Sequence, residues 1–136
     1  MRVFISHSHE TKGLAEKLGE ELRRAGMDVW NYEVDILPGD NWAQKIGQAL
    51  ESSQAMVALL TPEALNSRTV LQEIQYALGN KTFNKRLIPV LVGSEDNIPI
   101  EKLPWILKHL NVIRLAAYGT QEAGIERITQ ALQAVA

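Results

Sequence analysis

The segment QAMVALLT, residues 54–61, is apolar at six consecutive positions, from Ala55 to Leu60. A strand that is apolar on both faces is typical of the centre of a parallel sheet, where helices cover each side. The segment therefore predicts a buried central strand, around which the rest of the chain is organised.

Apolar runs and amphipathic stretches alternate on both sides of this segment. The other predicted strands are short apolar runs, at 2–6, 27–32, 86–93 and 111–117. The predicted helices carry apolar side chains three or four positions apart, over 11–26, 40–50, 66–79, 100–110 and from Gln121 onward. Asp40 is expected to be the N-cap of the second helix, and Thr69, in a capping box with Gln72, that of the third.

This alternation of strands and helices predicts an α/β fold, with a parallel sheet covered by helices on both faces. Right-handed crossovers leave few arrangements of five strands, and the simplest is the flavodoxin-like order 2-1-3-4-5. A ligand then binds beyond the carboxyl ends of strands 1 and 3. Those ends carry Ser6 to His9 and the segment that leads into the helix over 66–79, so both are expected at one crevice.

The chain has 136 residues, a formal charge of -2 and no cysteine. Its 14 basic residues are spread along the chain, so we expect no binding to nucleic acid, which needs a clustered basic surface. Disulfides and thiol nucleophiles are excluded, and we see neither a membrane span nor a signal peptide. We interpret residues 1–136 as one cytoplasmic domain, compatible with excision from a longer multidomain protein.

Glu73 lies among the apolar positions of the helix over 66–79. At about 100° per residue, the apolar stripe centres near Ile74 and places Glu73 at its margin, which predicts a half-buried carboxylate. An acid early in a helix also interacts favourably with the helix dipole. The helix alone therefore leaves a structural and a catalytic role open.

Several chemistries find no support around this crevice. His7 and His9 lack the further ligands of a metal site, and no glycine-rich phosphate loop or GxSxG nucleophile occurs. A phospho-receiver domain requires an acidic pair after strand 1 and an Asp at the end of strand 3, and this sequence has no Asp at either place. One carboxylate can stabilise the cationic transition state of glycosidic cleavage. A leaving group that is cationic while bonded, as the pyridinium of nicotinamide is, needs no general acid, so one carboxylate is enough.

The chain resembles a TIR (Toll/interleukin-receptor) domain over nearly its whole length, and most closely the bacterial, NAD-cleaving branch. The matching motifs are VFISHSHE (3–10), ILPGDNW (36–42), SQAMVALLTPEALNS (53–67), SRTVLQE (67–73) and LIPVLV (87–92). The resemblance implies an NAD+ nucleosidase that releases nicotinamide and forms ADP-ribose or a cyclic isomer. NAD+ is then the substrate, with no further cofactor and no metal.

The resemblance also implies roles for individual residues. Glu73 would be the catalytic carboxylate, and NAD+ would bind to Ser6, His7, Ser8, His9, Trp42 and Ser67. Thr69 stands where NAD-cleaving relatives often carry Trp, which puts substrate affinity and the choice of product in question.

The loop of Asp35, Ile36, Leu37, Pro38 and Gly39 would mediate self-assembly with other TIR domains, although Ile36 and Leu37 could equally cap the edge of the sheet. A sensor domain would drive this assembly in bacterial anti-phage immunity. The alternatives are a non-catalytic TIR adaptor or scaffold, and a virulence mimic of host TIR signalling.

Overall fold

A computed structural model describes residues 1–30, 32 and 36–136. Its sheet has five parallel strands in the order β2-β1-β3-β4-β5, which confirms the predicted fold class. The strands are β1 (Arg2–Ser6), β2 (Asp28–Trp30), β3 (Ala55–Leu60), β4 (Leu87–Leu91) and β5 (Ile113–Arg114).

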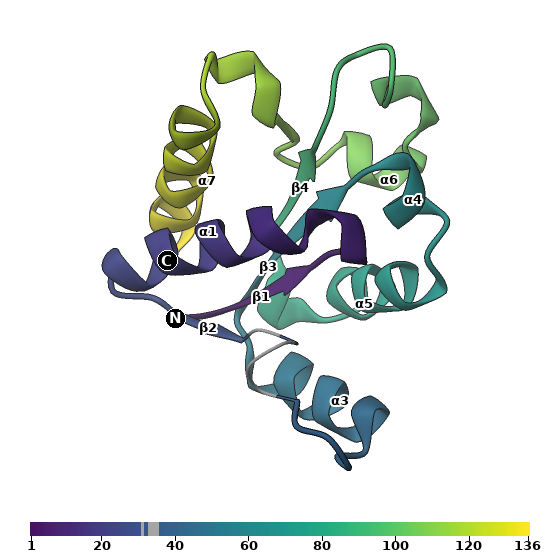
Figure 1. The fold of residues 1–136 in the computed structure, drawn as a ribbon, viewed down its shortest axis with the longest axis vertical. Coiled ribbons are helices and arrows are strands. Elements are labelled where there is room, and N and C mark those ends of the chain that lie inside the picture. Colours follow the sequence, from purple (N-terminus) through teal and green to yellow (C-terminus); the bar gives the residue numbers. More distant parts are fainter. Residues whose placement is uncertain (31, 33–35) are drawn as a thin grey trace.

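Helices cover both faces of this sheet (Figure 1). One face packs against α1 (Lys12–Arg24) and α7 (Gln121–Val135). The other packs against α3 (Trp42–Ser52), α4 (Pro62–Leu65), α5 (Arg68–Leu78) and α6 (Trp105–Lys108). In the part of the chain that the structure describes, no helix is long and apolar enough to cross a membrane.

The central strand β3 is buried along its whole length, as predicted. Its side chains alternate between the two faces, with Val57 and Leu59 toward α1 and α7, and Met56 and Leu60 toward α3 and α5. Neighbouring β1 repeats this alternation. The strands that end at the candidate crevice are therefore held rigidly by two separate apolar layers.

Two predicted helix caps are wrong by one or two residues. Asn41, not Asp40, caps α3, because its side chain accepts a hydrogen bond from the Gln44 N–H at 3.1 Å. The Asp40 carboxylate instead accepts from the Leu37 N–H at 2.8 Å and closes the preceding turn. In α5, Ser67 is the N-cap and accepts from the Val70 N–H, so that Thr69 already lies inside the helix.

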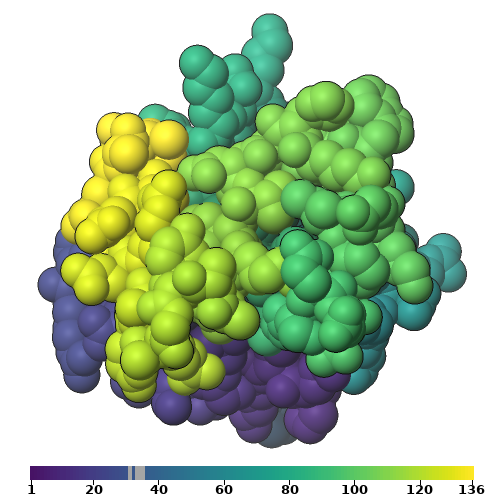
Figure 2. All heavy atoms as spheres, turned by 90° about the horizontal axis from the view of Figure 1, so that it is seen from above, coloured from purple at the N-terminus to yellow at the C-terminus, as the bar shows by residue number. Residues whose placement is uncertain are grey.

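The C-terminal half is more irregular than the sequence predicts. The helix expected over 100–110 divides into a 3-10 turn, η3 (Ile100–Lys102), and α6, because Pro104 forces the residue before it out of the helical region. The strand expected over 111–117 ends at Arg114, where η4 (Leu115–Tyr118) begins. A short helix, α4, occupies part of the expected loop after β3. Figure 2 shows the face that is formed mostly by this half of the chain.

Gly124 marks the contact between α7 and η4. A Cβ added at Gly124 would lie 3.0 Å from the Leu115 carbonyl oxygen and would also overlap the Leu115 side chain. We expect Gly124→Ala to lower the free energy of unfolding by about 1–2 kcal/mol, since overpacking outweighs the gain in helix propensity. Gly13→Ala on α1 is the control, because its Cβ would meet nothing within 4 Å. Urea unfolding should show this control unchanged or stabilised, and equal effects at both positions would contradict the prediction.

Candidate active site

The candidate site lies where β1, β2 and β3 end and α5 begins. Ser6 is the last residue of β1, Tyr32 follows β2 by two positions, and Glu73 lies in the middle of α5. The strand order places β1 between β2 and β3, so residues far apart in the sequence meet at one edge. This is the edge at which a ligand is expected in such sheets.

The Glu73 carboxylate is held by two hydroxyl groups. The Ser6 hydroxyl donates to Oε1 at 2.6 Å, and the Tyr32 hydroxyl lies 2.6 Å from Oε1 and 2.5 Å from Oε2. Glu73 is 2% exposed and Ser6 is fully buried. The predicted half-burial of Glu73 is therefore wrong, because Ser6 of β1 and Tyr32, two positions after β2, cover the carboxylate.

Aromatic packing fixes the position of Tyr32. Its ring meets Phe4 and Trp30 edge to face, with centroids 5.8 and 5.2 Å apart, and lies 5.0 Å from the His7 ring. Phe4 and Trp30 stack in parallel at 5.3 Å. The sequence-based site did not include Tyr32. The signal was present, because Tyr32 ends the predicted second strand, which the predicted order places beside Ser6.

Burial changes the acidity of both partners. It raises the pKa of Glu73 from 4.5 to about 7, although the hydrogen bonds from Ser6 and Tyr32 oppose the shift. Burial is also the largest cause of the raised pKa of Tyr32, and the negative charge of Glu73 and the hydrogen bond to Glu73 raise it further. Tyr32 therefore stays a neutral donor, and Glu73 changes its charge near neutral pH.

The raised pKa of Glu73 predicts a stability that falls as the pH rises. Below pH 4.5 the carboxyl group is protonated in both the folded and the unfolded protein. Above it, the unfolded chain loses this proton first, so the free energy of unfolding falls until the pH passes about 7. The difference corresponds to about 3 kcal/mol.

Urea unfolding of the wild type and Glu73→Gln at several pH values measures this effect. Because the variant cannot titrate at position 73, we expect its stability to rise relative to the wild type between about pH 4.5 and 8. A stability difference that stays constant across this range would contradict the assigned pKa.

A cleft of about 620 Å³ opens beside Tyr32. Five of the predicted site residues line it, namely His7, Ser8, His9, Trp42 and Ser67. The remaining lining residues are Tyr32, Glu63, Asn66 and Thr69. Ser6 and Glu73 are not among the described residues that line this cleft.

Glu73 instead lines a smaller pocket of about 250 Å³ between α3 and α5. The two hollows share Trp42 and Thr69, so these side chains stand at the boundary between them. Trp42 is 48% exposed and begins α3, where it presents an aromatic surface to both. Ser67 uses its hydroxyl to cap α5 while lining the cleft.

The predicted assembly loop precedes α3. Asp35 lies outside the described residues. Ile36 is half-buried and packs against the core, whereas Leu37 is 62% exposed. Pro38 and Gly39 are exposed, and Gly39 has φ +90°, a backbone conformation that favours glycine. The loop thus presents Leu37 to solvent and anchors itself through Ile36.

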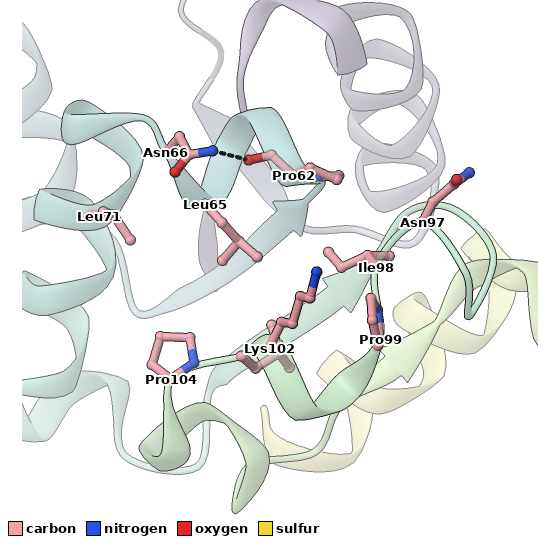
Figure 3. A pocket seen from close by; sticks show the side chains of 10 residues that line it. Pro62, Leu65, Asn66, Leu71, Asn97, Ile98, Pro99, Lys102 and Pro104 are labelled. Carbon is pink, nitrogen blue, oxygen red and sulfur yellow. Dashed lines mark hydrogen bonds between the residues drawn. The ribbon is translucent and has the colours of Figure 1, made fainter.

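A groove of about 540 Å³, separate from the cleft and the pocket described above, lies between α4 and the segment over 97–104 (Figure 3). Its wall is mostly apolar and carries one cation, Lys102, while Asn66 donates a hydrogen bond to the Pro62 carbonyl at its rim. No carboxylate occurs among the described residues of this groove. Over residues 1–30, 32 and 36–136, no three His, Asp or Glu side chains come together as a metal site.

The curated relatives of this chain include an NAD+ hydrolase and a cyclic ADP-ribose synthase. "NAD(+) hydrolase PdTIR" of Paracoccus denitrificans (strain Pd 1222) is 37% identical over 60 residues, which cover 43% of this chain and 20% of that protein. "2' cyclic ADP-D-ribose synthase AbTIR" of Acinetobacter baumannii (strain 1295743) is 25% identical over 132 residues, which cover 96% and 47%. The chain therefore spans less than half the length of these relatives.

A solved structure and a family model agree on the fold. The crystal structure of the TIR domain of the Toll-related receptor TRR-2 from Hydra magnipapillata superimposes with a TM-score of 0.74 at 19% identity, covering 96% of this chain and 97% of that one. The model of the TIR domain family matches residues 3–129. Because this match extends over nearly the whole sequence, the chain belongs to the TIR domain family.

Proposed function

We propose that this TIR domain cleaves the bond between nicotinamide and ribose in NAD+. The observation that carries the proposal is the single carboxylate, Glu73, held by two hydroxyl groups at the ligand-binding edge of the sheet. The names of the two relatives, an NAD+ hydrolase and a cyclic ADP-ribose synthase, support it. The cleft beside Tyr32 has a volume typical of ligand sites.

The chemistry requires one negative charge and no general acid. When the ribose C1′–N bond breaks, its electron pair leaves with the pyridinium nitrogen, so nicotinamide departs as a neutral molecule. Positive charge develops on the ribose, and an ionised Glu73 stabilises this oxocarbenium-like transition state. Attack by water, which loses a proton, gives ADP-ribose. Attack by a hydroxyl of the same molecule, which loses its proton to water, gives a cyclic isomer.

We assign the substrate's remaining groups to the residues that line the cleft. Ser8 and His9 offer a hydroxyl and ring nitrogens to phosphate or ribose oxygens. His7 lines the cleft beside them, with its Nδ1 2.8 Å from the Ser8 carbonyl oxygen. Trp42 offers a surface on which a base can stack. Thr69 offers no such surface, so we expect Trp42 to be the main stacking partner.

We further propose that self-association through the loop that carries Leu37 activates the domain. An exposed leucine next to an anchored isoleucine suits a contact with another TIR domain. A sensor domain, in this protein or in another, would then control assembly, as part of a bacterial response to phage. The exposed Leu37 also favours the alternative function of an adaptor that only assembles.

The proposed function is tested by incubating the purified domain with NAD+ in two samples, one with the domain dilute in solution and one with it clustered on vesicles. We expect nicotinamide to appear together with ADP-ribose or a cyclic isomer in equal amount, and faster release when the domain is clustered. Separation of the products by chromatography identifies which one forms. Intact NAD+ in every sample, although the domain self-associates, would favour the adaptor.

A further inference from the structure

Tyr32 stands between the cleft and the carboxylate of Glu73. Its side chain lines the cleft with His7 and Trp42, whereas Glu73 opens onto the smaller pocket. The Tyr32 hydroxyl lies within hydrogen-bonding distance of both carboxylate oxygens of Glu73. The carboxylate is therefore occupied by the chain's own hydroxyl, and the residue that supplies it faces the cleft.

We propose that the Tyr32 hydroxyl and a hydroxyl of the substrate's ribose compete for the Glu73 carboxylate, so that Tyr32 controls the access of NAD+ to Glu73. The proposal rests on the proposed function, because it needs Glu73 to act on ribose. A phenol and a sugar hydroxyl are both neutral O–H donors, and a carboxylate accepts either one in the same way. Hydrogen bonds to a charged acceptor are strong, which makes Tyr32 an effective competitor.

The other approaches to Glu73 are closed or narrow. At 2% exposure, Glu73 cannot touch a ribose in the cleft while Tyr32 stays in place. The pocket between α3 and α5 also reaches Glu73, but about 250 Å³ is below the usual size of a pocket for a whole ligand. The Tyr32 side chain must therefore move before cleavage.

Ser6 contacts the same carboxylate but, unlike Tyr32, it does not line the cleft. It is fully buried and does not occur among the described residues that line the cleft. A ribose bound in the cleft would therefore leave the hydrogen bond between Ser6 and Glu73 in place. Two hydroxyl groups on one carboxylate thus have separate roles. Ser6 is a positioning residue for Glu73, and Tyr32 is a competitor of the substrate.

Steady-state kinetics of NAD+ cleavage by Tyr32→Phe test this assignment. The variant keeps the ring and its packing on Phe4 and Trp30 but loses the competing hydroxyl. Loss of the Tyr32 hydrogen bond also raises the pKa of Glu73, so the comparison is made at about pH 9, where Glu73 is ionised in both proteins. There we expect kcat/KM to rise about tenfold, mainly through a lower KM. Tyr118→Phe removes a hydroxyl far from Glu73 and should match the wild type, and Ser6→Ala should not raise kcat/KM. An unchanged or lower kcat/KM in Tyr32→Phe, or an equal rise in Ser6→Ala, would overturn the proposal.

A binding measurement separates this proposal from the proposed function. ADP-ribose carries the ribose hydroxyls but no nicotinamide bond, and the chain has three tyrosines that can be labelled with 3-fluorotyrosine. We expect ADP-ribose to shift the fluorine resonance that is missing in Tyr32→Phe, and to bind that variant about tenfold more tightly. No binding, or binding that leaves this resonance in place, would overturn the competition. If the resonance shifts while no variant cleaves NAD+, only the proposed function fails.

Discussion

Replacing Glu73 by glutamine is expected to slow nicotinamide release from NAD+ by about a hundredfold or more, the typical loss when a group that stabilises the transition state is removed. Glutamine has nearly the same shape and still accepts a hydrogen bond from Ser6, so the fold should remain. It carries no charge, so it cannot stabilise the developing positive charge on ribose. Initial rates of the two proteins, clustered at equal density, measure the loss.

Glu63→Gln is the matched control for this substitution. Glu63 lines the cleft beside Tyr32, next to the pocket that Glu73 lines, and it is an exposed residue of the short helix α4. The same change of charge should therefore leave the rate within about twofold of the wild type, as surface substitutions usually do little. If both variants lose activity equally, the effect comes from the charge of the cleft as a whole, and Glu73 has no special role.

The rate of NAD+ cleavage is expected to rise about tenfold between pH 6 and pH 8. With a pKa of about 7, Glu73 is about one tenth ionised at pH 6 and nine tenths ionised at pH 8. Only the ionised form stabilises the oxocarbenium-like transition state, so the rate follows this fraction. Initial rates with NAD+ well below KM, at constant ionic strength, give the profile.

The residual activity of Glu73→Gln is the control for the pH profile. It should show no rise with a midpoint near pH 7, because the titrating group is gone. A wild-type rate that is flat across this range, or that falls as the pH rises, would show that an ionised Glu73 is not required.

The sheet was predictable because its signals lie within single segments. Six consecutive apolar residues identify β3, and the alternation of strands and helices then fixes the strand order through the crossover rule. This order predicts that the helix of Glu73 lies near the end of β1, and the contact with Ser6 confirms it. The end of β5 could not be predicted in the same way, because Leu115 leaves the strand to pack against α7.

The details of the site depend on contacts between elements. The periodicity of α5 describes only that helix, so it placed Glu73 at a margin and could not reveal the cover that Tyr32 and Ser6 provide. Asp40 and Asn41 are both suitable caps for α3. Asp40 accepts a hydrogen bond within the preceding turn, so Asn41 caps the helix. Tyr32 belongs to no motif in the sequence, so its contact with Glu73 is what identifies it as a site residue.

Nicotinamide release from NAD+ by the wild-type domain tethered to vesicles, measured beside Glu73→Gln at the same surface density, tests directly whether Glu73 is catalytic. We expect sustained release by the wild type and almost none by the variant. Equal release by both proteins, or none by either at a density at which the domain self-associates, would contradict the claim that Glu73 cleaves NAD+ in this TIR domain.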